Sequence, residues 1–388
     1  MTSFYYYNPT RVYFGRRMIK NLRSMVSEYN NILFVYGQDS IKRNGLYAEV
    51  MCELEDKNVM EFGGVMPNPT TDMINNGVSL CRKNDIDFVV AAGGGSVCDS
   101  AKLIAAGACL DENDDFWDEF FVNGKPVKIS LPTGIIITAP GSGSEMSCSA
   151  VATNPVTMEK RNSGGEGLYP LFCIIDAEYT YSLSAEQMAC GCVDAFVHLC
   201  ETYFSTPDEP NLSDYMLEAV MKCLIDSALD MIDNPNQYRA RANIMWCSTV
   251  AMNGIVKCCK RGDWFTHVME HEISGEYPEI PHGAGLAALY PQYLKLLADA
   301  HYEKLVRFAK NVWGISGGND DDIVSEAVRK TENFFKNIGA DCNLPAINTD
   351  IISGRMEKHI RNYPNIKAED IRQILNGAIE KTMSFEVK

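Results

Sequence analysis

The chain contains six histidines, and they are concentrated in one part of it. Four of them lie in the central part of its second half: His198, His267, His271 and His282. Asp194 lies four residues before His198 in a stretch of helical periodicity, so both side chains face the same side of a helix and could share a ligand. His267 and His271 form a second pair of this spacing, and His282 is expected in a turn after two prolines. Any one of these histidines alone is more often structural, but together the carboxylate and imidazoles suit Zn²⁺ or Fe²⁺. The set contains no thiolate, which argues against a purely structural zinc.

Two glycine-rich segments each follow a predicted strand in the first half. Residues 93–95 and Ser96 open a helix, where glycine lets a ligand approach the backbone and free N–H groups bind an anion. Ser96 and Asp99 have the spacing of a capping box, and the second segment covers residues 138–145. Neither segment is the GxGxxG dinucleotide fingerprint, and each alone could be an ordinary turn or loop. Two such loops at strand ends are better explained by a nucleotide lying across both.

The combination of a metal and a nucleotide predicts a hydride-transfer reaction. A divalent cation beside a nicotinamide would lower the pKa of an alcohol so that hydride could leave, and would polarise an aldehyde in the reverse direction. A titratable group must then exchange the hydroxyl proton with solvent, and the pKa range of histidine makes His271 a candidate.

The first half of the chain alternates strand-like and helix-like stretches. Short apolar runs predict buried parallel strands at residues 31–37, 87–92, 129–138 and 171–175. Helical patterns lie between them, including residues 71–84 and 98–108. This alternation predicts a parallel sheet covered by helices.

From about residue 183 the strand signals end and helix-period segments follow, at residues 185–205, 212–232, 237–259, 284–312, 322–338 and 367–383. Ser184 has the type of an N-cap, and Gln187 is spaced to complete a capping box. We therefore expect an α/β dinucleotide-binding domain over residues 1–180 and an all-helical metal-binding domain over residues 181–388.

Bulk properties exclude several classes of partner. The net charge of −16 argues against nucleic acid and against anionic membrane surfaces, because both require clustered Lys and Arg. No apolar run is long enough to span a bilayer, and the first residues lack the pattern of a signal peptide. The 14 cysteines include no CxxC pair and are expected to be reduced thiols, which favours a cytoplasmic protein.

Taken together, these segments resemble the iron-containing (group III) alcohol dehydrogenase family, particularly its butanol dehydrogenase and aldehyde reductase branch. The similarity covers nearly the whole chain, including Asn8-Pro9-Thr10, Pro67-Asn68-Pro69, both glycine loops and the stretch from Asp194 to His282-Gly283. The resemblance implies an α/β domain with a parallel sheet followed by an all-α metal-binding domain, the architecture of dehydroquinate synthase. It also implies a homodimer that interconverts a primary alcohol and its aldehyde.

The family pattern implies a specific division of roles. Its metal ligands correspond to Asp194, His198, His267 and His282, and the metal is iron or zinc. Its additional histidine corresponds to His271, which would lie near the nicotinamide without binding the metal. The approach to His282 is one residue longer than the usual family pattern, so the ligand turn is expected to be reshaped.

The predicted cofactor contacts combine the glycine loops with residues implied by the resemblance. They are Gly37, Gln38, Asp39, Ser40, Asn68, Gly94, Gly95, Ser96, Asp99, Thr138, Ser142, Ser144 and Lys160. An acidic side chain at position 39 favours a free ribose 2′-hydroxyl and hence NAD, although Ser40, Lys42 and Arg43 could instead receive the 2′-phosphate of NADP. We expect NAD or NADP, with a slight preference for NAD.

Two other functions are compatible with parts of this pattern. Dehydroquinate synthase, a lyase, also uses NAD and a metal, but it needs many more basic residues to bind a phosphorylated substrate. A metal-binding or assembly protein without catalysis would not need two glycine loops. The alcohol dehydrogenase interpretation accounts for both the metal set and the loops.

Overall fold

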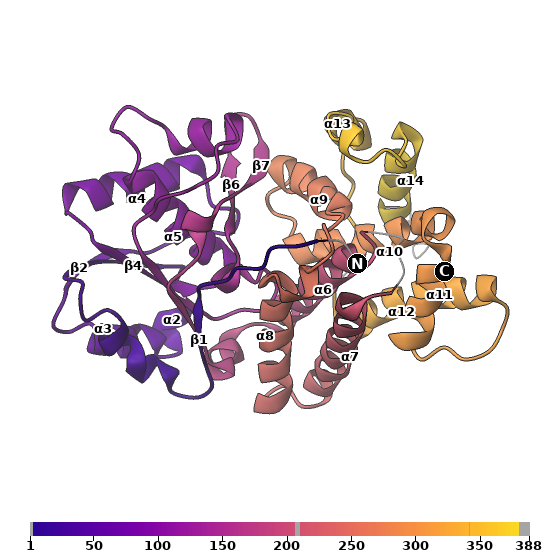
Figure 1. The fold of residues 1–388 in the computed structure, drawn as a ribbon, viewed down its shortest axis with the longest axis horizontal. Helices are drawn as coiled ribbons and strands as arrows, with labels where there is room; N and C mark the ends of the chain where they lie inside the picture. Colours follow the sequence, from indigo (N-terminus) through magenta and orange to yellow (C-terminus); the bar gives the residue numbers. More distant parts are fainter. Residues whose placement is uncertain (1–2, 206–209, 341, 380–388) are drawn as a thin grey trace. The chain divides into compact units, whose positions relative to one another are not determined.

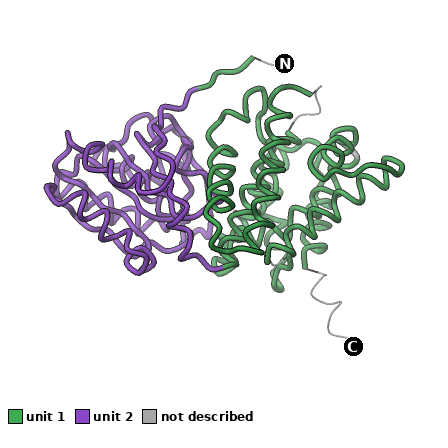
Figure 2. Tube along the Cα trace, turned by 90° about the horizontal axis from the view of Figure 1, so that it is seen from below, with its two compact units in different colours: residues 1–6, 185–388 green, residues 7–184 purple. Residues whose placement is uncertain are grey.

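The computed structural model of the chain describes residues 3–205, 210–340 and 342–379. It divides into two compact units, one made of residues 7–184 and the other of residues 1–6 and 185–388 (Figure 2). The first unit contains the strands and the second is helical, so each is described in turn.

A six-stranded parallel sheet in the order β1-β8-β5-β4-β2-β3 forms the centre of the α/β unit (Figure 1). Its strands are β1 (Arg11–Phe14), β2 (Asn31–Tyr36), β3 (Asn58–Phe62), β4 (Phe88–Gly93), β5 (Thr133–Ile137) and β8 (Phe172–Ile175). The predicted apolar runs correspond to the four inner strands, whose alternate residues are buried on both faces, as in a sheet covered by helices on each side.

The sequence pattern failed at one inner strand and at both edges of the sheet. Residues 129–132, which we assigned to a strand, precede β5, and Ile129 is 73% exposed. The edge strands β1 and β3 were not predicted, because their mixed exposure gives no continuous apolar run. An antiparallel hairpin of β6 (Ser149–Asn154) and β7 (Glu159–Gly164) was also missed, since its residues are largely polar or small.

The helices of the α/β unit lie between the strands in sequence. They are α1 (Leu22–Met25), α2 (Ser40–Arg43), α3 (Leu46–Glu53), α4 (Thr71–Lys83) and α5 (Gly95–Ala108). On one face of the sheet, Phe34, Phe88 and Phe172 join a core completed by residues of α1 and α3. The rings of Phe88 and Phe172 stack with their centroids 5.9 Å apart. The predictions for residues 71–84 and 98–108 are confirmed as α4 and α5.

The described part of the second unit contains helices and loops but no strand. Its helices are α6 (Ala185–Tyr203), α7 (Leu212–Asp233), α8 (Tyr238–Met252), α9 (Phe265–Glu276), α10 (His282–Ala300), α11 (Tyr302–Asn311), α12 (Asp320–Asn337), α13 (Thr349–Met356) and α14 (Ala368–Ile379). Nearly all of α6 from Met188 onward is buried, as expected of a helix at the centre of a bundle.

Three predicted helices differ from the structure. Residues 284–312 form two helices because His301 leaves the helical conformation, with φ −132°. The helix predicted over 237–259 ends at Met252, and Gly254 then adopts φ +92°. His282, predicted in a turn, is the first residue of α10, and residues 380–383 of the last predicted helix lie outside the described residues.

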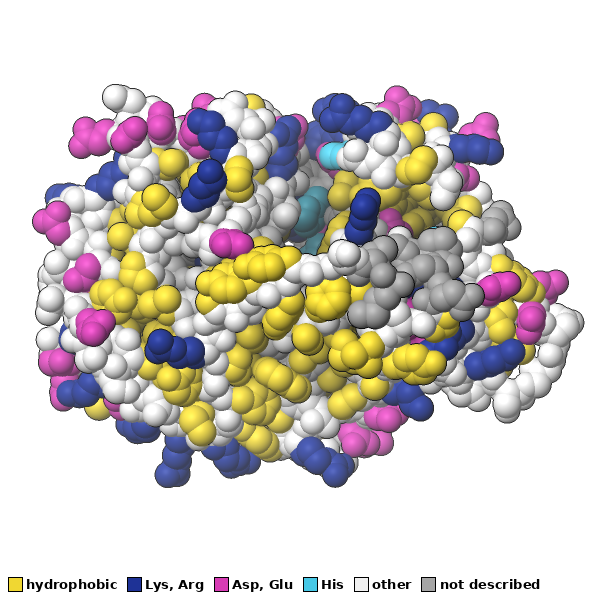
Figure 3. Space-filling view, in the orientation of Figure 1, with side chains coloured by type: hydrophobic (Ala, Val, Ile, Leu, Met, Phe, Trp, Pro, Cys, Tyr) yellow, Lys and Arg dark blue, Asp and Glu magenta, His cyan; other side chains and the backbone are white. Residues whose placement is uncertain are grey.

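The charged surface residues and the cysteines of the described residues show no regular arrangement. Lys and Arg side chains are interspersed with Asp and Glu on the face seen in Figure 3. None of the described helices has the length and apolar character that a bilayer span requires. All 14 cysteines are free thiols.

Gly134 is expected to be essential for close packing at the centre of the sheet. A Cβ atom there would lie 2.2 Å from the Phe172 ring, so Gly134→Ala forces that ring away from Phe88. We expect a loss of about 1–3 kcal/mol in the free energy of unfolding, measured by urea denaturation. Gly354→Ala is the control, because a Cβ at this exposed helical position meets nothing within 4 Å. It should stabilise the protein by about 0.5–1 kcal/mol, and equal effects of the two changes would contradict the packing argument.

Candidate metal centre and glycine loops

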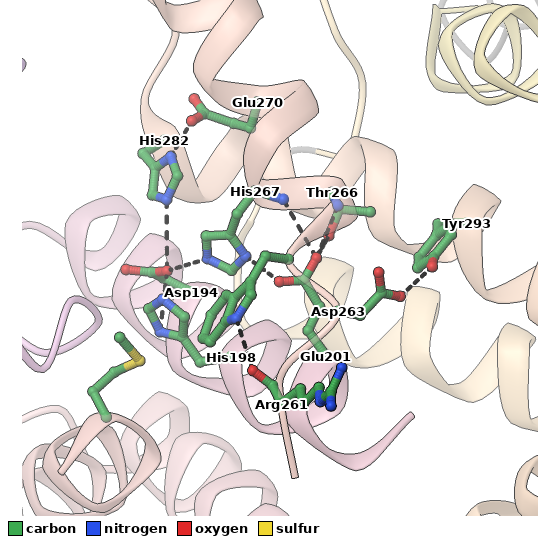
Figure 4. Close-up of polar contacts among 12 residues, drawn as sticks. Asp194, His198, Glu201, Arg261, Asp263, Thr266, His267, Glu270, His282 and Tyr293 are labelled. Atoms are coloured by element: carbon green, nitrogen blue, oxygen red, sulfur yellow. Dashed lines mark hydrogen bonds and ion pairs between the residues drawn. The ribbon is translucent and has the colours of Figure 1, made fainter. Parts of the chain in front are cut away.

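The carboxylate of Asp194 is the point where three histidines of the helical unit converge (Figure 4). Its Oδ1 atom lies 3.3 Å from His267 Nε2, 3.5 Å from His198 Nδ1 and 3.6 Å from His282 Nε2. Asp194 and His198 come from α6, His267 from α9 and His282 from the first turn of α10. The structure therefore brings together all four residues that the sequence indicated as metal ligands.

The surroundings of these four residues fit a bound cation. Ligand atoms of Asp194, His267 and His282 all lie within 4.8 Å of one another. The His198 ring stacks on that of His267 with centroids 4.4 Å apart, and its buried Nδ1 atom faces Asp194 Oδ1 at 3.5 Å without forming a hydrogen bond. A buried nitrogen without a hydrogen bond is costly unless an ion or another partner occupies the space it faces. Imidazole nitrogens and one carboxylate are ligands that Zn²⁺ and Fe²⁺ both accept.

Glu201 contacts the Nδ1 side of the His267 ring, away from Asp194, and our sequence analysis did not identify it. This fully buried carboxylate lies 2.5 Å from His267 Nδ1, on the side of the ring opposite Asp194. It also accepts hydrogen bonds from the backbone N–H of Thr266, at 2.8 Å, and from the Thr266 hydroxyl. The spacing offered a signal, because Glu201 follows Asp194 by seven residues, two turns along the same helix face. Carboxylates of this kind orient metal-binding histidines.

Glu270 has a corresponding position beside His282 and was also missed as a functional residue. It is buried on α9, and its Oε2 atom is within hydrogen-bonding distance of His282 Nδ1. The Ser274 hydroxyl donates to the other carboxylate oxygen. His271, one residue further on, is half-buried, and its ring centroid lies 5.7 Å from that of His282. Ligand atoms of Glu270, His271 and His282 form a second group within 4.8 Å of one another.

In the α/β unit, the two glycine loops lie against each other at the carboxyl ends of β4 and β5. The backbone N–H of Thr138 donates to the Gly93 carbonyl at 2.9 Å, and a Cβ atom on Gly95 would lie 2.6 Å from the Ser142 hydroxyl. Glycine is therefore needed at position 95 for the loops to meet. The first turn of α5 carries no side-chain cap, so its N–H groups have no side-chain acceptor at the N-cap position.

The predicted capping box of Ser96 and Asp99 is wrong. Gly94 is the N-cap of α5, and both residues lie within the helix. The Asp99 carboxylate instead accepts from the Ser144 hydroxyl, at 2.5 Å, and from the Val151 backbone N–H, at 3.0 Å. Tertiary contacts with the second loop and β6 thus replace the local bond that the spacing predicted.

A buried lysine completes this network. Lys102 donates to the Ser144 hydroxyl at 2.9 Å and to the Ser149 carbonyl at 2.8 Å. Burial lowers the pKa of Lys102, even though Asp99 favours its charged form. The predicted contacts Asp99 and Ser144 are therefore engaged with each other inside the unit, where they fix the second loop on α5.

The remaining predicted cofactor residues occupy several positions in the same unit. Gly37, Gln38, Asp39 and Ser40 follow β2, the neighbour of β4, and the side chains of Gln38 and Asp39 are exposed. Asn68 has a left-handed backbone with φ 54°. Lys160 is buried in the β6–β7 hairpin, where it pairs with Thr153.

Comparisons with known proteins identify the family. The family model described as iron-containing alcohol dehydrogenase matches residues 9–177, and the model of the Fe-containing alcohol dehydrogenase C-terminal region matches residues 188–386. The chain belongs to the iron-containing alcohol dehydrogenase family. It is therefore an oxidoreductase, and the resemblance inferred from its motifs is confirmed.

Relatives of the enzyme cover most of its length. It is 36% identical over 388 residues to NADH-dependent butanol dehydrogenase A of Clostridium acetobutylicum, covering 96% of this chain and 99% of the relative. It is 36% identical over 344 residues to an NADPH-dependent aldehyde reductase of Escherichia coli, covering 89% of each. The crystal structure of an NADH-dependent butanol dehydrogenase A from Thermotoga maritima matches with a TM-score of 0.92 at 32% identity, covering 98% of this chain and 99% of that one. The expected fold class is confirmed.

Charges in the enzyme's histidine cluster are strongly coupled. Burial lowers the pKa of His198 to about 3. Burial also opposes the charged form of His267, but Glu201 and Asp194 outweigh it and raise the pKa of His267 to about 10. Burial would raise the pKa of Asp194, yet the neighbouring histidines hold it below its usual range. In the metal-free cluster His267 therefore carries an additional proton and lies between the carboxylates of Asp194 and Glu201.

This charge state predicts how metal uptake depends on pH. Below about pH 10 the metal-free His267 is protonated, and a cation can bind its Nε2 atom only after that proton leaves. We expect release of about one proton per metal ion at pH 7–8 and an apparent affinity that rises with pH over this range. Calorimetric titration in two buffers of different ionisation enthalpy measures the number of protons, and a value near zero would contradict this account.

Proposed function

We propose that the enzyme interconverts a primary alcohol and its aldehyde by hydride transfer with NAD or NADP, at a metal held by Asp194, His198, His267 and His282. The observation that carries this proposal is the convergence of three histidines from three helices on one buried carboxylate. Family membership supports the reaction class, and it favours a dehydrogenase over the dehydroquinate synthase-like lyase or a catalytically inactive metal-binding protein.

Different residues of the chain provide the negative charge, the orientation of the histidine ring and the proton transfer. A bound Fe²⁺ or Zn²⁺ would act as a Lewis acid toward the substrate oxygen. Asp194 supplies the negative charge of the site, and Glu201 holds the His267 ring so that its Nε2 atom faces Asp194. His271 lies beside His282, where its imidazole can exchange the hydroxyl proton with solvent.

The glycine loops are proposed to hold the pyrophosphate of the cofactor. The N-terminus of α5 has N–H groups and the positive end of the helix dipole directed beyond the carboxyl end of β4. The contact between Gly95 and Ser142 places the second loop beside this end. Asp99, Lys102 and Ser144 are buried under the loops and maintain their shape.

The nucleotide preference rests on the segment after β2. Asp39 is exposed and lies at the start of α2, where a carboxylate favours a ribose 2′-hydroxyl over a 2′-phosphate. The Lys42 ammonium lies 5.3 Å from the Tyr36 ring centroid and 5.2 Å from that of Tyr47. Relatives use either cofactor, since one is described as NADH-dependent and another as NADPH-dependent. We infer a preference for NAD.

The proposed location and assembly rest on the cysteines and on the family resemblance. The free thiols suit a reducing compartment such as the cytoplasm. A homodimer is proposed from the family resemblance, and light scattering coupled to gel filtration tests it. The partners expected are small alcohols and aldehydes.

Turnover with butanal tests the proposed reaction directly. The enzyme, purified without air and loaded with Fe²⁺ or Zn²⁺ in parallel, should oxidise NADH in the presence of butanal and other short aldehydes. The metal-free enzyme is the control. Failure to oxidise NADH or NADPH across the whole aldehyde panel with either metal would reject the proposal.

Replacing His267 and His271 separates metal binding from proton transfer. His267→Ala should lose metal and activity together, because it removes a ligand and leaves the buried Glu201 without its imidazole partner. His271→Ala should retain the metal while kcat falls on the order of 100-fold and its pH profile changes. Metal content by mass spectrometry and pH–rate profiles measure these outcomes, and an empty metal site in His271→Ala would show that the roles are assigned incorrectly.

Replacing Asp39 tests the nucleotide preference. Asp39→Ala removes the charge that would repel a 2′-phosphate, so the ratio of kcat/KM with NADH to that with NADPH should fall at least about tenfold. Asp111→Ala is the matched control, because this exposed acid follows the C-terminal end of α5 rather than the loop end. An unchanged ratio in Asp39→Ala would remove Asp39 from the nucleotide site.

A further inference from the structure

His282 is shared by two groups of potential metal ligands. Its Nε2 atom lies 3.6 Å from Asp194, within the group that also contains His267. Its Nδ1 atom faces Glu270, within the group that also contains His271. A single imidazole ring thus stands between two places where a cation could be held.

The protonation chemistry of imidazole allows only one of these choices at a time. A neutral ring carries one N–H donor and one nitrogen lone pair, and a metal binds at the lone pair. A carboxylate ion can only accept a hydrogen bond, so a proton on Nδ1 is stabilised where Glu270 faces that atom. The lone pair is then left on Nε2, on the side of Asp194.

The protein holds Glu270 in this position from two other directions. The Ser274 hydroxyl, one helical turn along α9, donates to Glu270 Oε1. Gly285 on α10 leaves the space for the side chain, because a Cβ atom there would lie 2.9 Å from Glu270 Cγ and 3.4 Å from Oε1. The glutamate side chain is fully buried, so its charge needs these partners.

We propose that Glu270 is a positioning residue that selects which nitrogen of His282 binds the metal. By keeping the proton on Nδ1, it directs Nε2 to the metal shared with Asp194 and closes the alternative site formed with His271. His271 is thereby left without metal and available to carry protons. This inference rests on the proposed metal site and extends it to a residue outside the four ligands.

Glu270→Gln tests the proposal, because an amide can donate to Nδ1 and so permit the opposite tautomer. In the cobalt-substituted enzyme we expect metal transfer to a chelator to be about 10–100-fold faster than in the wild type. The visible d–d absorption bands should also shift, since a different nitrogen or a rotated ring alters the ligand field. Glu272→Gln is the matched control on the same helix, because Glu272 pairs with His359, at 2.9 Å, and Arg355.

A second variant retains the charge in case Glu270→Gln fails to fold, which circular dichroism would reveal. Gly285→Ala places a methyl group against Glu270 and should change the chelation rate and spectrum in the same direction. Wild-type rates and spectra in the folded variants would overturn the role of Glu270. A wild-type enzyme that binds no cobalt would instead reject the proposed metal site itself.

Discussion

The charge of Asp194, buried in the middle of α6, is the constraint on which the helical unit depends. An isolated carboxylate in such a place is very unfavourable, so it must be paired with cations or with hydrogen-bond donors. The partners come from two other helices as well as from α6, which requires the first turns of α9 and α10 to meet α6. The close approach of α10 is visible at Gly283, where a Cβ atom would lie 2.3 Å from the Cys190 carbonyl oxygen. The packing of the unit and the geometry of the site therefore have the same cause.

Carboxylates behind the histidines extend this arrangement outward. Glu201 on α6 faces His267, and Glu270 on α9 faces His282. Both α6 and α9 therefore provide a carboxylate that contacts a histidine of another helix. Such outer contacts fix the ring orientation and would set the tautomer of a histidine at the proposed metal site. They also explain how Glu201 and Glu270 can be buried, since each contacts an imidazole and a hydroxyl group. The same contacts raise the pKa of His267, so a cation at the proposed site would compete with a proton.

The α/β unit also stabilises buried charged groups, but it does so with different residues. Asp99, Lys102 and Ser144 form a buried network that ties the loop after β5 to α5, while Gly94, the N-cap of the helix, has no side chain to cap its first N–H groups. Such uncapped N–H groups at a helix start can bind the phosphates of a dinucleotide. The sequence spacing had assigned Asp99 to a local cap with Ser96. Because the partner is 45 residues away in the chain, local spacing could not reveal it.

The sequence by itself determined the class of fold, the approximate positions of the inner strands and the four residues that meet at Asp194. Apolar runs identify buried strands, and i,i+4 spacing places Asp194 and His198 on one helix face, because both signals are local. Tertiary structure decided what depends on distant neighbours. The edge strands lack a continuous apolar pattern. His282 lies in the first turn of α10, although the two prolines before it favour a turn. The contacts of Glu201 and Glu270 with histidines are made between different helices. Residue spacing identifies the side chains that share one face of a helix, whereas only the packed fold shows which helix faces are in contact.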